Sequence, residues 1–180
     1  MEMFFIFFGG MCTLILILEF VPVLIKKIST SSKIQKTKFL SDSEISNFDC
    51  TLNNKLINDI VVNLYSIYRN AYTSLNLDVL KKVCNYEIVN SIENEFKILD
   101  IIIPFNSKVD INIEYLGTSD IKIDGGIEKV IVYLKTTEPT IQFIDKRVSM
   151  SSYRSTSSFK ITLFRQLNSN SFIIDSFEAI

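Results

Sequence analysis

The most apolar stretch of the chain lies at its N-terminus. Residues 3–18 contain no charged side chain, Glu19 interrupts the pattern, and residues 20–25 resume it. A helix over residues 3–25 would be roughly 34 Å long at about 1.5 Å per residue, enough to cross a hydrocarbon core of about 30 Å. A cleaved signal peptide would begin with a positive region, whereas only an acid precedes this run. The pattern therefore predicts an uncleaved transmembrane anchor over residues 1–27.

Lysines follow the apolar run, and none precedes it. The positive-inside rule keeps a lysine-rich flank in the cytoplasm, or by analogy in a mitochondrial matrix. We therefore expect a single-pass protein of a bacterial plasma membrane or a mitochondrial inner membrane, with its N-terminus outside and its domain inside. The lysines either set this topology alone, or they also contact anionic lipid headgroups. The candidate headgroup contacts are Lys26, Lys27, Lys33, Lys36 and Lys38.

Glu19 is a polar residue inside the apolar stretch. A carboxylate within a bilayer is costly and often marks a functional position, such as a contact with a partner helix. Glu19 is therefore a candidate intramembrane polar site. The alternative is a position beside the inner headgroups, close to Lys26.

Residues 28–54 predict a linker. The first part, through residue 38, is rich in Lys, Ser and Thr and contains no acid, which is typical of a flexible tether. Residues 39–54 mix acidic and apolar side chains and suit a short helix or a loop. A folded domain is then expected over residues 55–180.

Helical periodicity follows the linker. Apolar residues recur every three or four positions from Asn54 to Ser74, which predicts an amphipathic helix. A second helix is expected from Val79 to Phe96, with Asn76 or Asp78 as its N-cap and a weaker middle. Asn85 and Tyr86 are the residues that indicate a kink there.

The period then changes from three or four residues to two. Alternating apolar and polar side chains over residues 109–115 are typical of a half-buried strand, and further strands are expected over 120–123, 130–134, 140–144, 159–167 and 171–177. Asp124, Gly125 and Gly126 predict a tight turn. Pro139 indicates a bend or an edge. The Ser-rich stretch over residues 149–158 suits a loop or an edge strand.

Two helices followed by an antiparallel sheet define an α+β domain. One face of such a sheet is buried against the helices, and the other face can stay in water. We expect a curved, cone-shaped sheet with the helices across its concave side and a pocket between them.

Composition excludes several kinds of site. The chain has no His, so histidine triads, histidine bases and histidine metal ligands are absent. Cys12, Cys50 and Cys84 are odd in number and far apart, which favours free thiols over a disulfide framework or a zinc site. Residues 1–40 carry a net charge of +3 while the whole chain carries -1, so the domain is mildly acidic and is not expected to bind nucleic acid. No motif indicates a cofactor or a metal.

The helical region resembles a known family. The segment IVVNLYSIYRNAYTSLNLDVLKKVCNYEIVNSIENEF, residues 60–96, is similar to the C-terminal domain of the 44-kDa subunit of the mitochondrial inner-membrane import translocase and its bacterial relatives. The shared features are an aromatic pattern that ends at Ala71, an acidic turn before Leu80, and a final Phe96. The C-terminal spacing from Phe159 to Arg165 resembles the same family, although the family usually has Trp at the first of these positions.

The resemblance implies a fold and a role. The implied fold is the cone-shaped α+β fold of nuclear transport factor two. The implied role is binding of translocase components, a chaperone or anionic lipid at the inner face of a membrane. The family's long chaperone-docking region has no counterpart here, so chaperone recruitment is not expected.

Three functions remain open from the sequence. The first is a membrane-tethered binding or scaffold module in protein translocation or complex assembly, with membrane lipids and an unidentified protein as partners. Its candidate contact residues are Tyr65, Tyr68 and Tyr72, whose helical spacing is equally typical of core packing. The alternative is the inner-membrane assembly subunit of a type IV secretion system, which has the same cone fold but a periplasmic domain.

An enzyme is the third and weakest hypothesis. Some proteins of this fold perform proton transfer with a buried Asp. Asp110, Asp124 and Asp175 are available, but each alternates with apolar residues on the side of a strand expected to face water. No paired-carboxylate, phosphate-binding or nucleophile motif is present. We therefore predict no catalytic residues, and a small-molecule or isomerase-like activity is the least favoured function.

Overall fold

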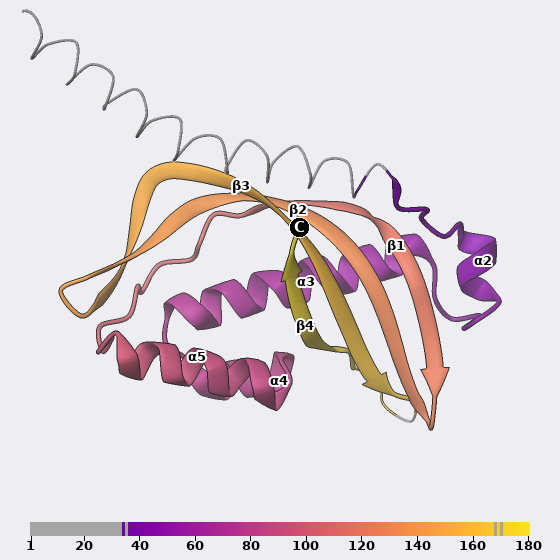
Figure 1. Ribbon diagram of the computed structural model, residues 1–180, viewed down its shortest axis with the longest axis horizontal. Coiled ribbons are helices and arrows are strands. Elements are labelled where there is room, and N and C mark those ends of the chain that lie inside the picture. Colours follow the sequence, from indigo (N-terminus) through magenta and orange to yellow (C-terminus); the bar gives the residue numbers. More distant parts are fainter. Residues whose placement is uncertain (1–33, 35, 168, 170) are drawn as a thin grey trace, which may run out of the picture. The chain divides into compact units, whose positions relative to one another are not determined.

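The computed structural model describes residue 34, residues 36–167, residue 169 and residues 171–180. Residues from Lys38 to Ile180 form one compact unit with an α+β architecture. The helices and strands of this unit, labelled in Figure 1, are α2 (Asp42–Ser46), α3 (Asn54–Thr73), α4 (Leu77–Val83), α5 (Tyr86–Ile98), β1 (Asn112–Asp124), β2 (Ile127–Ile144), β3 (Arg147–Gln166) and β4 (Ile173–Ala179).

The described strands form one antiparallel sheet in the order β1-β2-β3-β4, so each strand pairs with its neighbour in sequence. The predicted turn at Gly125 and Gly126 is confirmed, with φ angles of 57° and 81° that suit glycine. The turn between β2 and β3 uses Asp145 and Lys146, which also have positive φ angles. That turn has no glycine, and the sequence pattern did not predict it.

The strands are longer than the periodicity predicts. The expected strands over 109–115 and 120–123 lie largely in one strand, β1, whose pairing with β2 shifts twice near Gly117. The expected strands over 130–134 and 140–144 are likewise parts of β2, and the pairing shifts at Pro139. Residues 149–158 belong to β3. The shift at Pro139 agrees with the bend expected there, because a bulge bends a strand without ending it.

The first predicted helix is confirmed, and the second is corrected to two helices. Asn53 caps α3, and Asn76 caps α4 as expected. At Cys84 the chain becomes extended and forms a bridge with Ile174 of β4. The Asn85 side chain then accepts a hydrogen bond from the Ile88 amide at 2.9 Å, which caps a new helix, α5.

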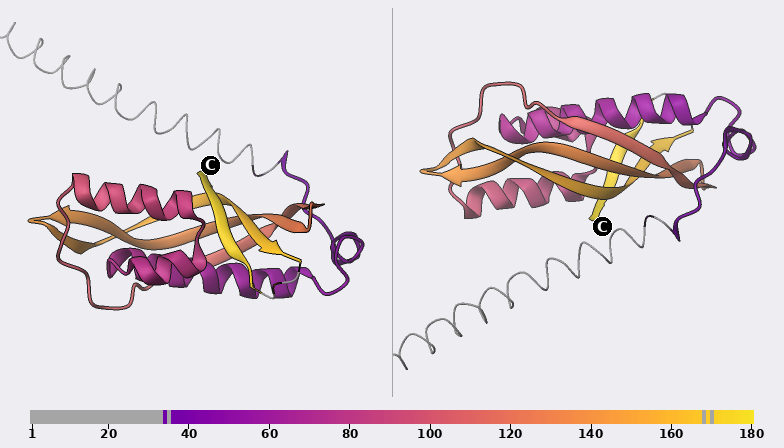
Figure 2. Two further views of the ribbon diagram at one scale, coloured as in Figure 1. Left: turned by 90° about the horizontal axis from the view of Figure 1, so that it is seen from below. Right: turned by 90° about the horizontal axis from the view of Figure 1, so that it is seen from above.

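The sheet arches over the helices in Figure 1, and Figure 2 shows α3 and α5 along opposite sides of the strands. Val130, Val132 and Leu134 of β2 are fully buried, because alternate residues of this strand point toward the helices. Val61 of α3 and Leu80 of α4 meet this layer, and both are fully buried. The core therefore lies between the concave face of the sheet and the helical layer.

The domain begins earlier than the predicted boundary at residue 55. Ile45 of α2 and Leu52 belong to the hydrophobic core. The Leu40 amide donates a hydrogen bond to the Thr118 carbonyl at 2.7 Å. A Cβ atom at Gly117 would lie 2.5 Å from the Phe39 ring, so the absence of a side chain there permits this close approach. Residues 38–54 are thus part of the domain, which corrects the second half of the expected linker.

The whole predicted membrane anchor, residues 1–27 with Glu19, Lys26 and Lys27, lies outside the described residues, as does Lys33 of the predicted linker. The part of the chain that the structure describes contains no helix with the length and apolarity needed to cross a membrane. Among the candidate headgroup contacts, Lys36 is exposed, and Lys38 forms a 2.9 Å ion pair with Glu44.

Candidate functional site

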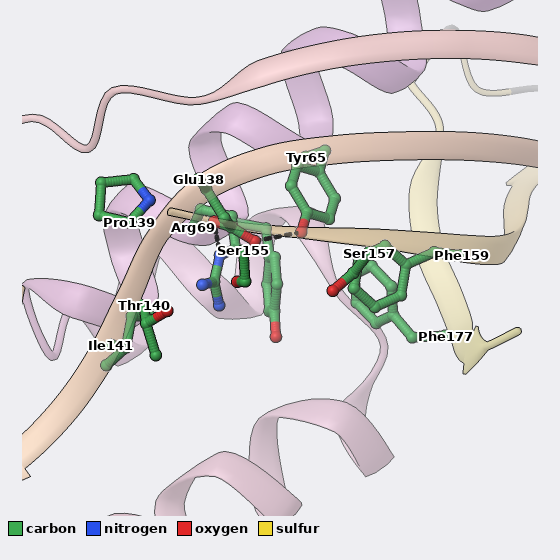
Figure 3. A pocket seen from close by; sticks show the side chains of 11 residues that line it. Tyr65, Arg69, Glu138, Pro139, Thr140, Ile141, Ser155, Ser157, Phe159 and Phe177 are labelled. Atoms are coloured by element: carbon green, nitrogen blue, oxygen red, sulfur yellow. Dashed lines mark hydrogen bonds and ion pairs between the residues drawn. The ribbon is translucent and has the colours of Figure 1, made fainter. Parts of the chain in front are cut away.

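A partly open cleft of about 300 Å³ lies between α3 and the far half of the β2–β3 hairpin. Figure 3 shows its lining from close by. The lining residues come from α3, β2, β3 and β4, and they are Tyr65, Tyr68, Arg69, Glu138, Pro139, Thr140, Ile141, Ser155, Ser157, Phe159 and Phe177.

The cleft forms where the inner face of the sheet changes from apolar to polar. Leu134 of β2 pairs with Phe159 of β3, and the next inward positions pair Thr136 with Ser157 and Glu138 with Ser155. Strand β4 pairs with β3 only over residues 159–164, so it does not continue beside this polar half. Small hydroxyl side chains and a missing neighbour strand leave space above α3.

An ion pair occupies the wall of the cleft. The Arg69 Nε atom donates to the Glu138 Oε2 atom at 2.7 Å, and the Tyr65 hydroxyl donates to Oε1 at 3.0 Å. The Arg69 and Glu138 side chains are only 15% and 9% exposed. Burial opposes the charge on Arg69, but the adjacent Glu138 carboxylate, together with the Tyr65 and Tyr68 hydroxyls, outweighs burial and raises the pKa of the guanidinium. The guanidinium therefore keeps its charge in a region with little water.

The structure brings two of the three predicted tyrosines to the cleft. Tyr65 is almost fully buried, and burial raises the pKa of its hydroxyl. The Tyr68 ring is half-buried and lies 4.7 Å from the Phe177 ring, and burial raises the pKa of Tyr68 to about 12. Both hydroxyls therefore stay protonated near neutral pH. Tyr68 is the more accessible of the two contacts.

Tyr72 does not line the cleft. Its hydroxyl donates to the Glu95 Oε2 atom at 3.0 Å, and its ring lies 5.2 Å from the Phe96 ring. These contacts join α3 to α5. Burial, followed by the Glu95 charge, raises the pKa of Tyr72. Tyr72 thus packs in the core, which was the alternative interpretation of the tyrosine spacing.

Sequence reasoning missed Arg69 and Glu138 as site residues. A signal for Glu138 was present, because residues 130, 132 and 134 alternate inward and the same period places residue 138 on the inner face. Arg69 gave no comparable signal. It falls among the polar positions of α3 and becomes buried only because the hairpin folds over it.

A second buried charge cluster lies outside the cleft. Arg165 of β3 forms ion pairs with Glu128 of β2 and with Asp49, which follows α2. Its guanidinium also lies over the Phe172 ring at 4.6 Å. Burial raises the pKa of Asp49, but hydrogen bonds from Thr51 and the Arg165 charge outweigh it, so the net pKa is lowered. This cluster holds the N-terminal part of the domain to the sheet.

The aspartates considered for catalysis lie away from the cleft. The Asp110 side chain is mostly exposed and pairs with Arg154 at 2.7 Å. Asp175 pairs with Lys129 at 2.9 Å, and Asp124 is exposed at the β1–β2 turn. None of the three lines the cleft. In the described part of the chain, no group of three or more Cys, Asp or Glu residues is arranged to hold a metal ion.

The two described cysteines differ in environment, and this difference predicts their reactivity. Cys50 is exposed, whereas Cys84 is buried and burial raises the pKa of its thiol to about 12. In a Cys12→Ser background at pH 8, we expect one thiol to react rapidly with Ellman's reagent and the second to react only after urea is added. Two fast thiols in the native protein would contradict the burial of Cys84. A Cys50→Ser variant identifies the fast thiol.

No protein-family model and no curated protein match the chain by sequence. The aromatic wall, the hydroxyl groups and the buried ion pair of the cleft together form a concave site with both apolar and polar contacts.

Proposed function

We propose that this protein is a membrane-tethered binding module in protein translocation or membrane-complex assembly. The domain would lie on the cytoplasmic or matrix face of an inner membrane. The apolar residues 3–25 and the lysines that follow them support this placement. The similarity of residues 60–96 to the translocase subunit domain, and a helical layer beneath a curved sheet, support the cone-shaped fold of nuclear transport factor two.

The cleft is the observation on which this proposal rests. Both carboxylate oxygens of Glu138 already accept hydrogen bonds, from Tyr65 and Arg69. A general base must lie within hydrogen-bond reach of a substrate proton, whereas a recognition site needs a fixed shape and fixed donors. The arrangement therefore favours binding over catalysis. We propose that Tyr68, at the accessible wall, contacts the partner.

Site-specific photocrosslinking in sealed inverted membrane vesicles tests this function. A benzophenone amino acid at position 68 should form a discrete adduct with a protein of the membrane complex. The same probe at Tyr86, which is 77% exposed on α5, serves as the control and should not form that adduct. Filling the cleft with Ser157→Leu should abolish the adduct. An adduct that persists in the filled variant would contradict the cleft as the contact site.

Protease protection in the same vesicles tests the topology. The proposal requires digestion of the domain, because the cytoplasmic face is outward in inverted vesicles. A protected domain would lie in the periplasm and would instead support the alternative, an assembly subunit of a type IV secretion system. Digestion after detergent addition controls for a domain that resists the protease when folded.

A further inference from the structure

The guanidinium of Arg69 has donors to spare inside the cleft. It bonds Glu138 through Nε, it also interacts with the Tyr68 hydroxyl, and its Cζ atom lies 5.6 Å from the centre of the Tyr72 ring. None of its four terminal N–H groups donates to a carboxylate or a backbone carbonyl of the described residues. The side chain is 15% exposed. Figure 3 shows the guanidinium among the lining side chains, next to Glu138 and on the side of Thr140. Guanidinium N–H groups in a partly buried cleft wall favour the binding of a ligand that carries a hydrogen-bond acceptor.

Other groups around Arg69 are also suited to a ligand. Thr140 lines the cleft, and its hydroxyl is buried without a hydrogen-bond partner among the described residues. Ser155 and Ser157 add two further hydroxyls. The opposite wall is aromatic, with Phe177 packed on Tyr68 at 4.7 Å. The cleft thus combines a polar end that donates hydrogen bonds with an apolar end.

We propose that the cleft binds a carboxylate attached to a small apolar or aromatic group. The terminal N–H groups of Arg69 present the fork that matches the two oxygens of a carboxylate. Since Glu138 already neutralises Arg69, a ligand with a single negative charge is favoured over a doubly charged phosphate. The volume of about 300 Å³ lies at the small end of ligand pockets, which suits a compact group.

Two sources present this chemistry. One is a free small acid, and the other is the C-terminal residue of a partner polypeptide with an apolar side chain. The inference rests on the proposed function, in which the cleft is the contact site, and it specifies the group that enters.

Isothermal titration calorimetry on the full-length protein in detergent tests which class of ligand the cleft binds. Phenylacetate and hexanoate should bind, and phenylacetamide and hexanamide should bind at least about tenfold more weakly, because the amides lack the charge. A short peptide that ends in Phe, with a free or an amidated C-terminus, distinguishes the two sources. Tighter binding of the free peptide than of phenylacetate indicates a polypeptide terminus, and the reverse indicates a small acid. Equal binding of acids and amides would overturn the proposal.

Matched variants locate the site. Ser157→Leu fills the cleft and should abolish acid binding. Thr156 pairs with Thr137 on the other face of the sheet, so the control variant Thr156→Leu should leave acid binding unchanged. Arg69→Lys keeps the charge but loses the fork, so it should weaken acid binding by about tenfold or more. Undiminished acid binding in both Ser157→Leu and Arg69→Lys would overturn the proposal. If no acid binds while position 68 still crosslinks specifically, only this inference fails and the proposed function stands.

Discussion

Replacing Arg165 with alanine is expected to lower the free energy of unfolding by about 3 to 5 kcal/mol. Glu128 has no exposed surface, and its Oε2 atom bonds Arg165 while its Oε1 atom has no partner among the described residues. The variant would leave this carboxylate buried and uncompensated. Asp49 would lose the same partner. Urea unfolding followed by circular dichroism measures the loss, which is a large part of the stability of a typical domain.

Arg154→Ala is the matched control for this prediction. Arg154 lies on the same strand and also pairs with an acid, but the Asp110 side chain is 84% exposed. An exposed pair contributes only about 0 to 1 kcal/mol, since water solvates the remaining charge. Similar losses in the two arginine variants would show that burial of Glu128 does not govern the effect.

The helices and strands illustrate which parts of a fold can be predicted from one sequence. Helix α3 keeps an unbroken apolar period over its length, so its bounds were predicted within a residue. In the strands, the bend at Pro139 was predicted, whereas the pairing shifts near Gly117 were not. Whether such a residue ends a strand or produces a bulge depends on the partner strand, which is not visible in local sequence. The break between α4 and α5 likewise depends on contacts of Cys84 and Asn85 with β4.

The candidate site was predictable to a smaller extent than the fold. Tyr65 and Tyr68 were found because a helical stripe is a local property. Glu138 is 73 residues from Tyr65 and 69 residues from Arg69, so the network depends on how the hairpin packs across α3. Pairing of a buried charge requires both partners in place, and neither position alone identifies the pair.

The start of the domain was misplaced for a similar reason. Phe39, Ile45 and Leu52 are isolated apolar residues in a polar stretch, and no period links them. Ile45 and Leu52 join the hydrophobic core, and Phe39 packs against Gly117 and the Tyr133 ring, contacts that only the tertiary structure creates. A short helix held by a capping box at Ser41 and by Asp49 is stable in this setting, although five residues alone would not form a helix.

Arg69→Met is the second variant with a large expected effect. It retains most of the volume but leaves the Glu138 carboxylate, 9% exposed, with only the Tyr65 hydroxyl as a donor. We expect the free energy of unfolding to fall by about 3 to 5 kcal/mol, because one charge of a buried pair is removed. Urea unfolding again provides the measurement.

The double variant Arg69→Met/Glu138→Gln separates stability from binding. The amide oxygen of Gln still accepts from the Tyr65 hydroxyl and has no charge to compensate, so most of the lost stability should return. The crosslink at position 68 and the binding of small acids should not return, since the guanidinium is absent. Such an outcome would mean that the ion pair is retained for recognition rather than for folding. Recovery of both properties would contradict a role for Arg69 in binding, and recovery of neither would show that the pair is needed to build the cleft.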